Sequence, residues 1–313
     1  MPQAGIVIVT YNSQAEIGEC LDAAITSGAE IVVVDNASSD RTVAEVEHRK
    51  VRLIANSSNR GFAAAVNQGF SVLDCEFILV LNPDAVLQSG LDPLIDACRL
   101  PHAAGAGGSL LDSEGRPQIG FMVRKFPTSV ALVLESVLLN RLWPDNPVNR
   151  SYRCLGLDYS IPSAVEQPAG AFLMLRRDVW QELRGFDEGF YPLWFEDVDF
   201  CRRAVDRGYQ LYFAPHAVAK HTGAHSIVRL PVEMRRFYWY RSLLRYSARH
   251  FHAISFRVVC LAVVLGSLLR VLGESVSQLS LSPMAVYGKV VRLAGRCLFF
   301  GWRDEAVLSG PRN

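Results

Sequence analysis

The chain has 313 residues, of which 50% are hydrophobic and 20% charged, so it is long and apolar enough to bury a sizeable core, and it is not a disordered chain. Its formal net charge is +1, but residues 226–313 hold 13 basic and 4 acidic side chains and carry +9, against −8 for the first 225 residues. This asymmetry predicts that the C-terminal part meets an anionic surface.

The seven cysteines are at least 23 positions apart and form no CxxC pair, which argues against a zinc ribbon and against a disulfide scaffold. We therefore expect reduced, mostly buried thiols in a cytosolic protein. The N-terminal segment MPQAGIVIVTYN has no basic region and runs directly into a strand pattern, so we expect no signal peptide.

The first hundred residues alternate short β-branched runs with helical stretches. The apolar runs lie at 5–10, 30–35, 51–56 and 76–82, and helical patterns lie between them at 14–26 and 62–73. Continuous apolar strands that alternate with helices predict an α/β fold with a parallel sheet covered on both faces.

Polar residues follow all four predicted strands. They are Thr10-Tyr11-Asn12, Asp35-Asn36, Asn56 and Asn82-Pro83-Asp84. Because ligands of such sheets bind at the carboxyl ends of the strands, the four strand exits together predict one crevice. Any single one of them is also what an ordinary polar loop contains.

The glycine-rich phosphate cradles GxGxxG and GxxxxGK[ST] are missing from the sequence, so a phosphate-bearing ligand would need another partner. Asp35 is placed to accept hydrogen bonds from a ribose or a base, or else to cap the next turn. Asp84 is placed to hold a divalent cation against a diphosphate, since Mg²⁺ is commonly bound by one or two carboxylates plus phosphate oxygens. Its other interpretation is a plain Asn-Pro turn.

The pattern weakens from 103 to 168 and then predicts a strand at 171–176, a helix at 178–183 and a strand at 209–214. Three carboxylates, Glu196, Asp197 and Asp199, lie between the last two elements. If a helix begins near Glu196, each residue advances about 100°, so Asp197 and Asp199 point about 200° apart and cannot serve one site. Arg203, four residues after Asp199, favours an ion pair on the helix surface.

The C-terminal part combines basic and aromatic side chains. A helical pattern near 233–251 places an apolar face beside an arginine stripe, formed by Phe237, Tyr240, Leu244 and Phe251 and by Arg241, Arg245 and Arg249. This is typical of a helix at a lipid surface, and the alternative is a helix packed on the catalytic domain with a solvated basic face. The apolar run 258–269 has 12 residues, whereas a span needs about 20, so we expect a helix that lies on the membrane, paired with 290–302.

Seven motifs together resemble one family. They are VTYN, VVVDNASSD, NRGFAAAVNQG, LNPD, QPAGAFLMLRRDVW, GFDEGFYPLWFEDVDFCRRA and VAKHTGAHS, in this order between residues 5 and 226. The chain is similar to the inverting glycosyltransferases of family 2, with the GT-A fold, and looks most like their rhamnosyltransferase-like branch, which acts on lipid-linked or polysaccharide acceptors.

The resemblance implies a nucleotide-sugar site. In the family, the first strand exit and the acid after the second strand hold the base and the ribose, and Asn59 to Asn67 would line the same pocket, with Gly61 allowing close backbone approach. The residues concerned here are Thr10, Tyr11, Asn12, Asp35, Asn59, Gly61, Asn67 and Asp84.

The resemblance also implies a cation site and a base. The family's DxD motif becomes Asn82-Pro83-Asp84, so one carboxylate is left, and His221 would complete a site for Mg²⁺ or Mn²⁺. Asp197 matches the general base, which takes the proton of the acceptor hydroxyl, and Glu196 would orient the acceptor or the base. The family inverts by single displacement.

The resulting prediction is an α/β chain of GT-A type, with a Rossmann-like, mostly parallel sheet flanked by helices. Residues 1–225 would form the catalytic domain, with a nucleotide-sugar half at 1–102 and an acceptor half at 103–225. Residues 226–313 would form a basic, amphipathic helical extension associated with the membrane.

The predicted reaction moves rhamnose or another hexose from dTDP-rhamnose or a UDP-sugar to a glycan or polyprenyl-linked acceptor, at the inner face of the cell membrane. Nucleic acid is not expected as a partner, because the arginines of the C-terminal part alternate with long apolar runs. Two alternatives stay open: a membrane-attached glycan-binding or scaffolding protein that has lost catalysis, and a nucleotidyltransferase. The oligomeric state is not predicted.

Overall fold

The computed structural model describes residues 3–223, 231–278 and 282–303. The predicted domain boundary at 225/226 and the end of the VAKHTGAHS motif lie outside these residues. The chain forms two compact units, which we describe separately. The first comprises Met1–Phe126, Arg150–Asp187 and Glu196–Arg229, and the second comprises Pro127–Asn149, Glu188–Phe195 and Leu230–Asn313.

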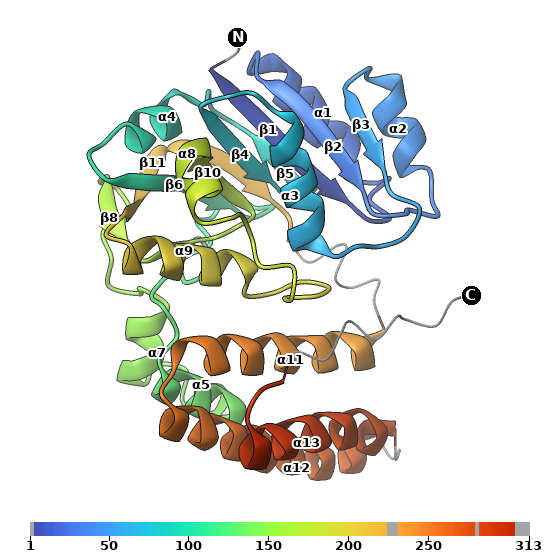
Figure 1. Cartoon of the computed structure of the whole chain (residues 1–313), viewed down its shortest axis with the longest axis vertical. Helices are drawn as coiled ribbons and strands as arrows, with labels where there is room; N and C mark the ends of the chain where they lie inside the picture. The colour runs from blue at the N-terminus through green and yellow to red at the C-terminus, as the bar shows by residue number, and fades with distance from the viewer. Residues whose placement is uncertain (1–2, 224–230, 279–281, 304–313) are drawn as a thin grey trace. The chain divides into compact units, whose positions relative to one another are not determined.

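The first unit contains a large mixed sheet with strand order β3-β2-β1-β4-β10-β6-β11-β5, and β8 pairs with β11 (Figure 1). Its strands are β1 (Ala4–Thr10), β2 (Glu30–Asp35), β3 (Arg52–Ala55), β4 (Phe77–Leu81), β5 (Ala85–Leu87), β6 (Ala103–Leu111), β8 (Ser163–Val165), β10 (Phe172–Arg176) and β11 (Gln210–His221). The predicted strands of the first hundred residues are confirmed, because each long β-branched run became a strand.

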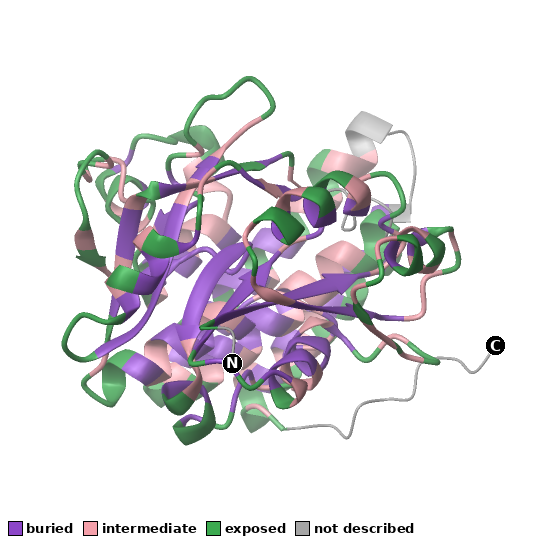
Figure 2. Cartoon of the chain, turned by 90° about the horizontal axis from the view of Figure 1, so that it is seen from above, coloured by how far each residue is buried: buried purple, intermediate pink, exposed green. Residues whose placement is uncertain are grey.

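Helices cover both faces of this sheet. Along β1, Ile6 and Ile8 join one buried cluster and Val7 and Val9 join the other, as expected where alternate side chains point to opposite faces. The first cluster takes in side chains of α1 (Ile17–Thr26), α2 (Thr42–His48) and α4 (Asp92–Cys98), and the second those of α3 (Phe62–Val72), α8 (Arg177–Glu182) and α9 (Glu196–Asp206). Figure 2 shows the buried strands beneath more exposed helices.

The topology brings several chain segments to one edge of the sheet. Strands β1, β2, β3 and β4 are parallel, so their carboxyl ends share that edge. Strand β10 is antiparallel to β4, with Phe172 opposite Leu81, so the residues just before β10 lie beside the exit of β4. Strand β11 again runs in the direction of β4, and its last residue, His221, pairs with Ala85 of β5.

A short second sheet supports the same edge. It pairs β7 (Val123–Arg124) with β9 (Gln167–Pro168), with Arg124 opposite Gln167. The seven cysteines are all free thiols and six of them are buried, which confirms that they form no disulfide framework.

The second unit is helical. Helix α12 packs on α5 and α13, and α11 packs on α13. Its helices are α5 (Ser129–Ser136), α6 (Leu139–Leu142), α11 (Val232–His250), α12 (Ala253–Gln278) and α13 (Ser282–Phe300), and α7 (Pro147–Tyr152) crosses the boundary between the units. A Cβ on Gly266 would lie 1.8 Å from the carbonyl oxygen of Ser136, so this glycine lets α12 approach α5 closely.

The length argument against a membrane span is wrong. Arg257 and Arg270 do not end the apolar helix, which runs for 26 residues, and Ala253–Ser275 is long and apolar enough to cross a membrane, with a mean hydropathy of 2.0. Arg270 instead lies inside the helix and donates to the carbonyl oxygens of Glu135 and Ser136. A core helix would pass the same length test, and 39% of this stretch is buried.

The arginine stripe of α11 is only partly solvated, because Arg249 is exposed whereas Arg241 and Arg245 are half-buried. Arg241 donates to the carbonyl oxygen of Tyr191 at 2.8 Å, and the Arg245 guanidinium lies 5.4 Å from the centre of the Phe190 ring. Both partners belong to the segment 188–195 of the same unit. Phe251 lies just past the end of the helix, whose last residue is His250.

Candidate active site

The end of β1 and the end of β2 are joined by a polar network. Thr10 Oγ1 donates to Asp35 Oδ1 at 2.7 Å, and both side chains are buried. The backbone N–H of Ser38 donates to Asp35 Oδ2 at 2.9 Å, and the Ser38 hydroxyl donates to Oδ1. The Asp35 carboxylate is therefore held rigidly by residues of the two strand exits.

Asn12 ties the loop after β1 to the loop after β2. Its backbone has a φ of 52°, in the left-handed region that asparagine tolerates better than most residues. Its N–H donates to Ser38 Oγ at 2.8 Å, and its side-chain oxygen accepts from the N–H of Ser39 at 2.7 Å. The neighbouring Tyr11 is half-buried at the same edge. These two loops form one ordered wall.

The turn before α3 joins this wall through Asn36, whose side-chain nitrogen donates to the carbonyl oxygen of Gly61 at 3.1 Å. Gly61 has φ 86° and ψ 161°, a conformation open essentially to glycine alone, and its N–H donates to Asn59 Oδ1 at 2.9 Å. Asn67 lies elsewhere, because its amide accepts from the N–H of Phe186 and donates to the carbonyl oxygen of Phe186, both at 3.0 Å.

Asp84 and His221 face each other across β5 and β11. Both are buried, and Asp84 Oδ1 lies 3.5 Å from His221 Nε2. Gln118 donates from Nε2 to the carbonyl oxygen of His221 at 2.7 Å, so its other amide atom, Oε1, accepts from His221 Nδ1 at 3.0 Å. The Nδ1 proton leaves the Nε2 lone pair of a neutral imidazole directed toward Asp84. The Phe121 ring stacks on the imidazole, with ring centres 5.3 Å apart.

This pair fits a divalent cation chemically. A carboxylate oxygen and a neutral imidazole nitrogen suit Mn²⁺, and a ligating histidine ordinarily donates its other N–H to an oxygen, as His221 does to Gln118. Within the described ranges there is no group of three or more His, Cys, Asp or Glu side chains that could hold a metal ion. A cation between Asp84 and His221 would therefore need further ligands from a bound molecule.

Asp197 is the second residue of α9, and its carboxylate is held by polar contacts. Its Oδ2 accepts from the N–H of Gly170 at 2.9 Å and from Gln167 Nε2 at 3.2 Å, and its Oδ1 accepts from the N–H of Val198 at 2.8 Å. Among the described residues, no Arg, Lys or His side chain pairs with Asp197 within ion-pair distance. Since Gly170 lies two residues before β10, the carboxylate lies at the sheet edge beside the exit of β4.

Burial raises the pKa of the Asp197 carboxyl above its ordinary value, and the N–H groups of Gly170 and Val198 and the charge of Arg124 oppose this rise. The carboxylate therefore remains a hydrogen-bond acceptor that gains basicity from its surroundings. These are the properties that a general base near neutral pH requires.

Glu196 is also buried but in a different environment. Burial, and after it the charge of Asp197, raises the pKa of Glu196 well above the ordinary range. Its Oε2 has no hydrogen-bond partner among the described residues. The backbone N–H of Glu196 itself opposes this rise, but burial outweighs it and favours the protonated form, which can donate one hydrogen bond.

The predicted ion pair of Asp199 and Arg203 is confirmed, but it is not on the helix surface. Arg203 Nε lies 2.7 Å from Asp199 Oδ2, and the Asp199 side chain is fully buried. The other guanidinium nitrogens of Arg203 donate to the carbonyl oxygens of Leu183 and Gly185, at 2.7 and 2.8 Å. This pair anchors α9 to the loop after α8, so Asp199 has a structural function.

Several residues at this edge of the sheet were not predicted from the sequence as site residues. Gln167 and Gly170 stand in the QPAGA motif, which drew attention as a motif but not residue by residue. Ser38 likewise stands in the VVVDNASSD motif without having been singled out. Gln118 and Arg124 gave no signal, because each is an ordinary polar residue in a loop or a short strand whose partners are distant in sequence.

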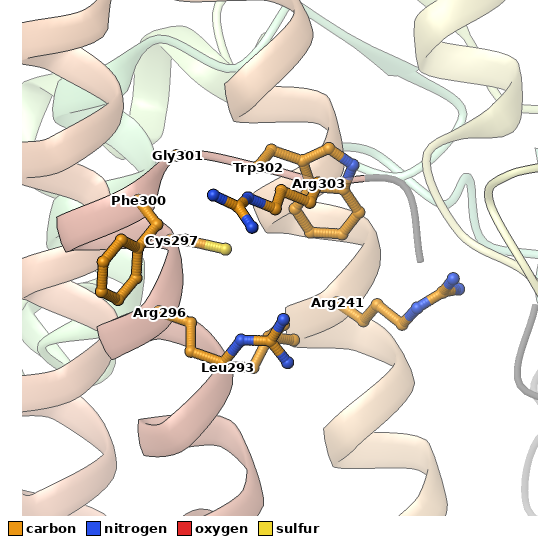
Figure 3. Close-up of a pocket in the computed structure, with 8 residues that line it drawn as sticks. All are labelled: Arg241, Leu293, Arg296, Cys297, Phe300, Gly301, Trp302 and Arg303. Carbon is orange, nitrogen blue, oxygen red and sulfur yellow. The ribbon is translucent and has the colours of Figure 1, made fainter. Parts of the chain in front are cut away.

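The second unit has a separate pocket of about 290 Å³. None of the predicted site residues lines it, and three of its lining residues are arginines, as Figure 3 shows. In that view the Arg241 guanidinium extends away from the other labelled side chains. The lining consists of Arg241, Leu293, Arg296, Cys297, Phe300, Gly301, Trp302 and Arg303.

Comparisons with known proteins agree with this arrangement. The sequence matches the model of glycosyl transferase family 2 over residues 5–160 and that of glycosyl transferase family group 2 over residues 155–295. One relative, N-acetylglucosaminyl-diphospho-decaprenol L-rhamnosyltransferase from Mycobacterium tuberculosis, is 28% identical over 280 residues, which cover 78% of this chain and 88% of the relative. Rhamnosyltransferase WbbL from Escherichia coli is 26% identical over 196 residues, which cover 61% of this chain and 69% of the relative.

Solved structures show the same fold at low sequence identity. Mannosyltransferase PcManGT from Pyrobaculum calidifontis, in complex with GDP-Man and Mn²⁺, has a TM-score of 0.53 and 15% identity, and the match covers 96% of this chain and 87% of that one. GalNAc-T7 with UDP, GalNAc and Mn²⁺ has a TM-score of 0.52 and 14% identity, with 80% and 50% covered. With its family matches, its rhamnosyltransferase relatives and this fold, the chain belongs to glycosyl transferase family 2, an inverting family, and is a glycosyltransferase of the GT-A type.

Proposed function

We propose that this glycosyltransferase moves rhamnose or another hexose from a nucleotide diphosphate to a hydroxyl group of a glycan carried on a polyprenyl diphosphate, with Asp197 as the base. The observation that carries the proposal is the position of the Asp197 carboxylate, which is hydrogen-bonded to the N–H of Gly170 and has no cationic side chain paired with it among the described residues. The name of the mycobacterial relative supports a lipid diphosphate acceptor and rhamnose.

The donor would bind at the wall formed by the exits of β1 and β2. The buried Asp35, fixed by Thr10 and Ser38, can accept hydrogen bonds from the ribose or the base, and Tyr11 and Asn12 would border the same pocket. Gly61 lets the backbone approach the ligand closely, with Asn59 fixing the turn. The expected donors are dTDP-rhamnose or a UDP-hexose.

Asp84 and His221 would hold Mg²⁺ or Mn²⁺ together with the donor diphosphate. When bound, the cation would neutralise the negative charge that builds on the leaving diphosphate. Two protein ligands are a small set, so the diphosphate would have to supply further oxygens, as is common for Mg²⁺.

The chemical step is a single displacement. As the acceptor oxygen attacks the anomeric carbon, its proton passes to a carboxylate oxygen of Asp197, and the bond between that carbon and the diphosphate oxygen breaks. A base of this kind contributes about 10²- to 10⁴-fold in rate. The neutral Glu196 beside it can donate a hydrogen bond that orients the acceptor hydroxyl.

The lipid acceptor is consistent with an exposed apolar stripe on α12. These side chains recur every three or four residues along one face, as expected where a helix lies against hydrocarbon. The basic residues of the C-terminal part would meet anionic headgroups at the inner face of the membrane. The stripe consists of Ile254, Val258, Leu261, Leu265, Leu268, Leu269 and Leu272.

The test is a transfer assay with dTDP-rhamnose and several UDP-sugars, with Mg²⁺, with Mn²⁺ or with a chelator. The acceptor would be N-acetylglucosamine on a short polyprenyl diphosphate, with the free sugar as control. We expect transfer to the lipid-linked acceptor alone, with the anomeric configuration inverted by NMR, and loss with the chelator. Transfer that is indifferent to the chelator would reject the cation assignment, and no transfer from any donor would reject the proposal.

A further inference from the structure

The segment Glu188–Phe195 leads directly into α9, whose second residue is Asp197. Two successive residues at its end, Trp194 and Phe195, have φ angles of 76° and 71°. Bulky side chains rarely adopt this left-handed conformation, and it persists only where the surrounding structure enforces it. The residues that enforce it therefore determine how the chain enters the helix that carries the base.

Helix α11 supplies the polar part of this restraint. Arg241 Nη1 donates to the carbonyl oxygen of Tyr191 at 2.8 Å, and the hydroxyl of Ser242 donates to the carbonyl oxygen of Leu193 at 3.0 Å. Ser242 is buried, so its bond to Leu193 does not compete with solvent. Two consecutive residues of α11 thus fix two backbone carbonyls within the five residues before Glu196.

Aromatic contacts between α11 and the segment Glu188–Phe195 supply a second part of this restraint. The Phe195 ring is buried, with centroid distances of 5.4 Å to Tyr246 and 6.5 Å to Trp239, and the Tyr191 ring meets Tyr238 edge-on at 6.3 Å. Packing of this kind fixes the orientation of a ring as well as burying its area.

Gly189 explains how the helix can approach so closely. A Cβ on Gly189 would lie 2.1 to 2.6 Å from three atoms of the Arg245 guanidinium group, and that group also lies over the Phe190 ring. Figure 3 shows the Arg241 guanidinium directed away from Arg296 and Arg303, which agrees with its hydrogen bond to Tyr191.

We propose that α11 is the scaffold of the segment Glu188–Phe195, and that Arg241 and Ser242 are positioning residues that hold the strained turn at Trp194 and Phe195, from which the chain continues to Asp197 two residues later. This inference rests on the proposed function, in which Asp197 is the base. It gives the C-terminal helices a second function besides contact with lipid, because the turnover of the enzyme depends on how α11 holds this segment.

The test is steady-state kinetics of Ser242→Ala and Arg241→Gln in the full chain. We expect kcat to fall about tenfold, with the KM for the donor and the thermal midpoint nearly unchanged, because a small displacement of a reacting group lowers the rate without removing donor contacts. Matched controls are Ser247→Ala, which loses only a bond to the carbonyl oxygen of Leu243 in its own helix, and Arg235→Gln on the same helix.

The pH profile of kcat distinguishes a positioning function of these residues from a general contribution to folding stability. If the base moves away from the N–H of Gly170, it loses a contact that lowers its pKa, so the acid limb of the profile should move to higher pH. Within the described part of the chain, Glu196, Cys201 and Arg124 also interact electrostatically with this carboxylate. A variant that merely folds less well would have a lower kcat at every pH, with the acid limb at the same pH as in the wild type. This outcome would overturn the inference.

A double-mutant cycle distinguishes this inference from the proposed function. If Ser242 acts through Asp197, Ser242→Ala should have no further effect in a chain that already carries Asp197→Asn. Full activity of Asp197→Asn would reject the base itself. Inactivity of Asp197→Asn, together with wild-type kcat and pH profile in both α11 variants, would reject the positioning inference alone.

Discussion

Replacing Gly170 with alanine perturbs the base without touching its chemistry. Gly170 donates its N–H to Asp197 Oδ2, and an alanine would keep this N–H. The added methyl group, however, would stand 2.9 Å from Asp197 Oδ2, 3.0 Å from its Cβ and 3.1 Å from its Cγ. The substitution therefore pushes the Asp197 carboxylate away without removing or adding a titratable group.

The size of the effect follows from these distances. Carbon atoms in contact prefer about 3.5–4.0 Å, so the Asp197 side chain must retreat by about 0.5–1 Å. Because a misplacement of about 1 Å can cost about 10²-fold, we expect kcat to fall about 10- to 100-fold in Gly170→Ala. In Asp197→Asn, which keeps the shape of the side chain but removes the proposed base, we expect kcat to fall about 10²- to 10⁴-fold.

The assay is sugar transfer under saturating donor, with the donor KM and the thermal midpoint measured on the same preparations. Gly156→Ala is the matched control, because no heavy atom of the described chain lies within 4 Å of where its Cβ would stand. Wild-type kcat in Gly170→Ala would show that the place of Asp197 does not limit turnover, and the base assignment would then be wrong.

Three other predictions concern protons, metal and lipid. Folding raises the pKa of Glu196 well above its ordinary value of 4.5, so wild-type stability should fall as pH rises from about 4.5 through the raised pKa, and Glu196→Gln should flatten this fall in denaturant unfolding. His221→Ala should abolish the thermal shift produced by Mn²⁺ with a nucleotide diphosphate, whereas His216→Ala, exposed on the same strand, should keep it. The pair Leu268→Glu and Leu272→Glu should weaken binding to phosphatidylglycerol vesicles by about tenfold or more in co-sedimentation, since both side chains are exposed.

The strands around the proposed donor site could be predicted because the pattern that indicates each strand lies within its own sequence. The run EIVVVD is β2 to the residue, the first run differs from β1 by one residue at its start, and the runs for β3 and β4 are one residue too long at each end. Buried parallel strands need apolar residues on both faces, so they are visible without knowledge of their neighbours. The helix start at Glu196, assumed from the sequence in order to compare Asp197 with Asp199, carries the same kind of local signal, a cluster of acids in a first turn.

Strand β6 was missed because its pattern depends on distant neighbours. Its sequence AAGAGGSLL looks like a loop, yet it pairs with β10 and β11 in the middle of the sheet. A Cβ on Gly105 would lie 2.4 Å from the carbonyl oxygen of Met174, and one on Gly108 would lie 2.4 Å from that of Ala217. Glycine is needed here by close approach of other strands, and a single sequence does not show that requirement.

The candidate site also contains contacts that the sequence predicts and contacts that only the structure shows. The spacing of Asp199 and Arg203 predicted their pairing, but their burial depends on Leu183 and Gly185, which are far along the chain. The Gln167 side chain and the N–H of Gly170, which donate to Asp197, come from a segment about thirty residues earlier. Only the structure shows these two contacts.

The two neighbouring carboxyls at the start of α9 show why adjacency in sequence does not mean a shared function. Asp197 receives hydrogen bonds from two backbone N–H groups, which favour its charged form, whereas Glu196 Oε2 receives none from the described residues. Burial raises the pKa of both carboxyls, and it raises that of Glu196 well above the ordinary range, where the charge of Asp197 adds to the rise. A single displacement needs one proton acceptor, and a second charged carboxylate at the anomeric carbon would add a competing nucleophile. In the proposed mechanism, a protonated Glu196 beside Asp197 therefore favours one displacement over two.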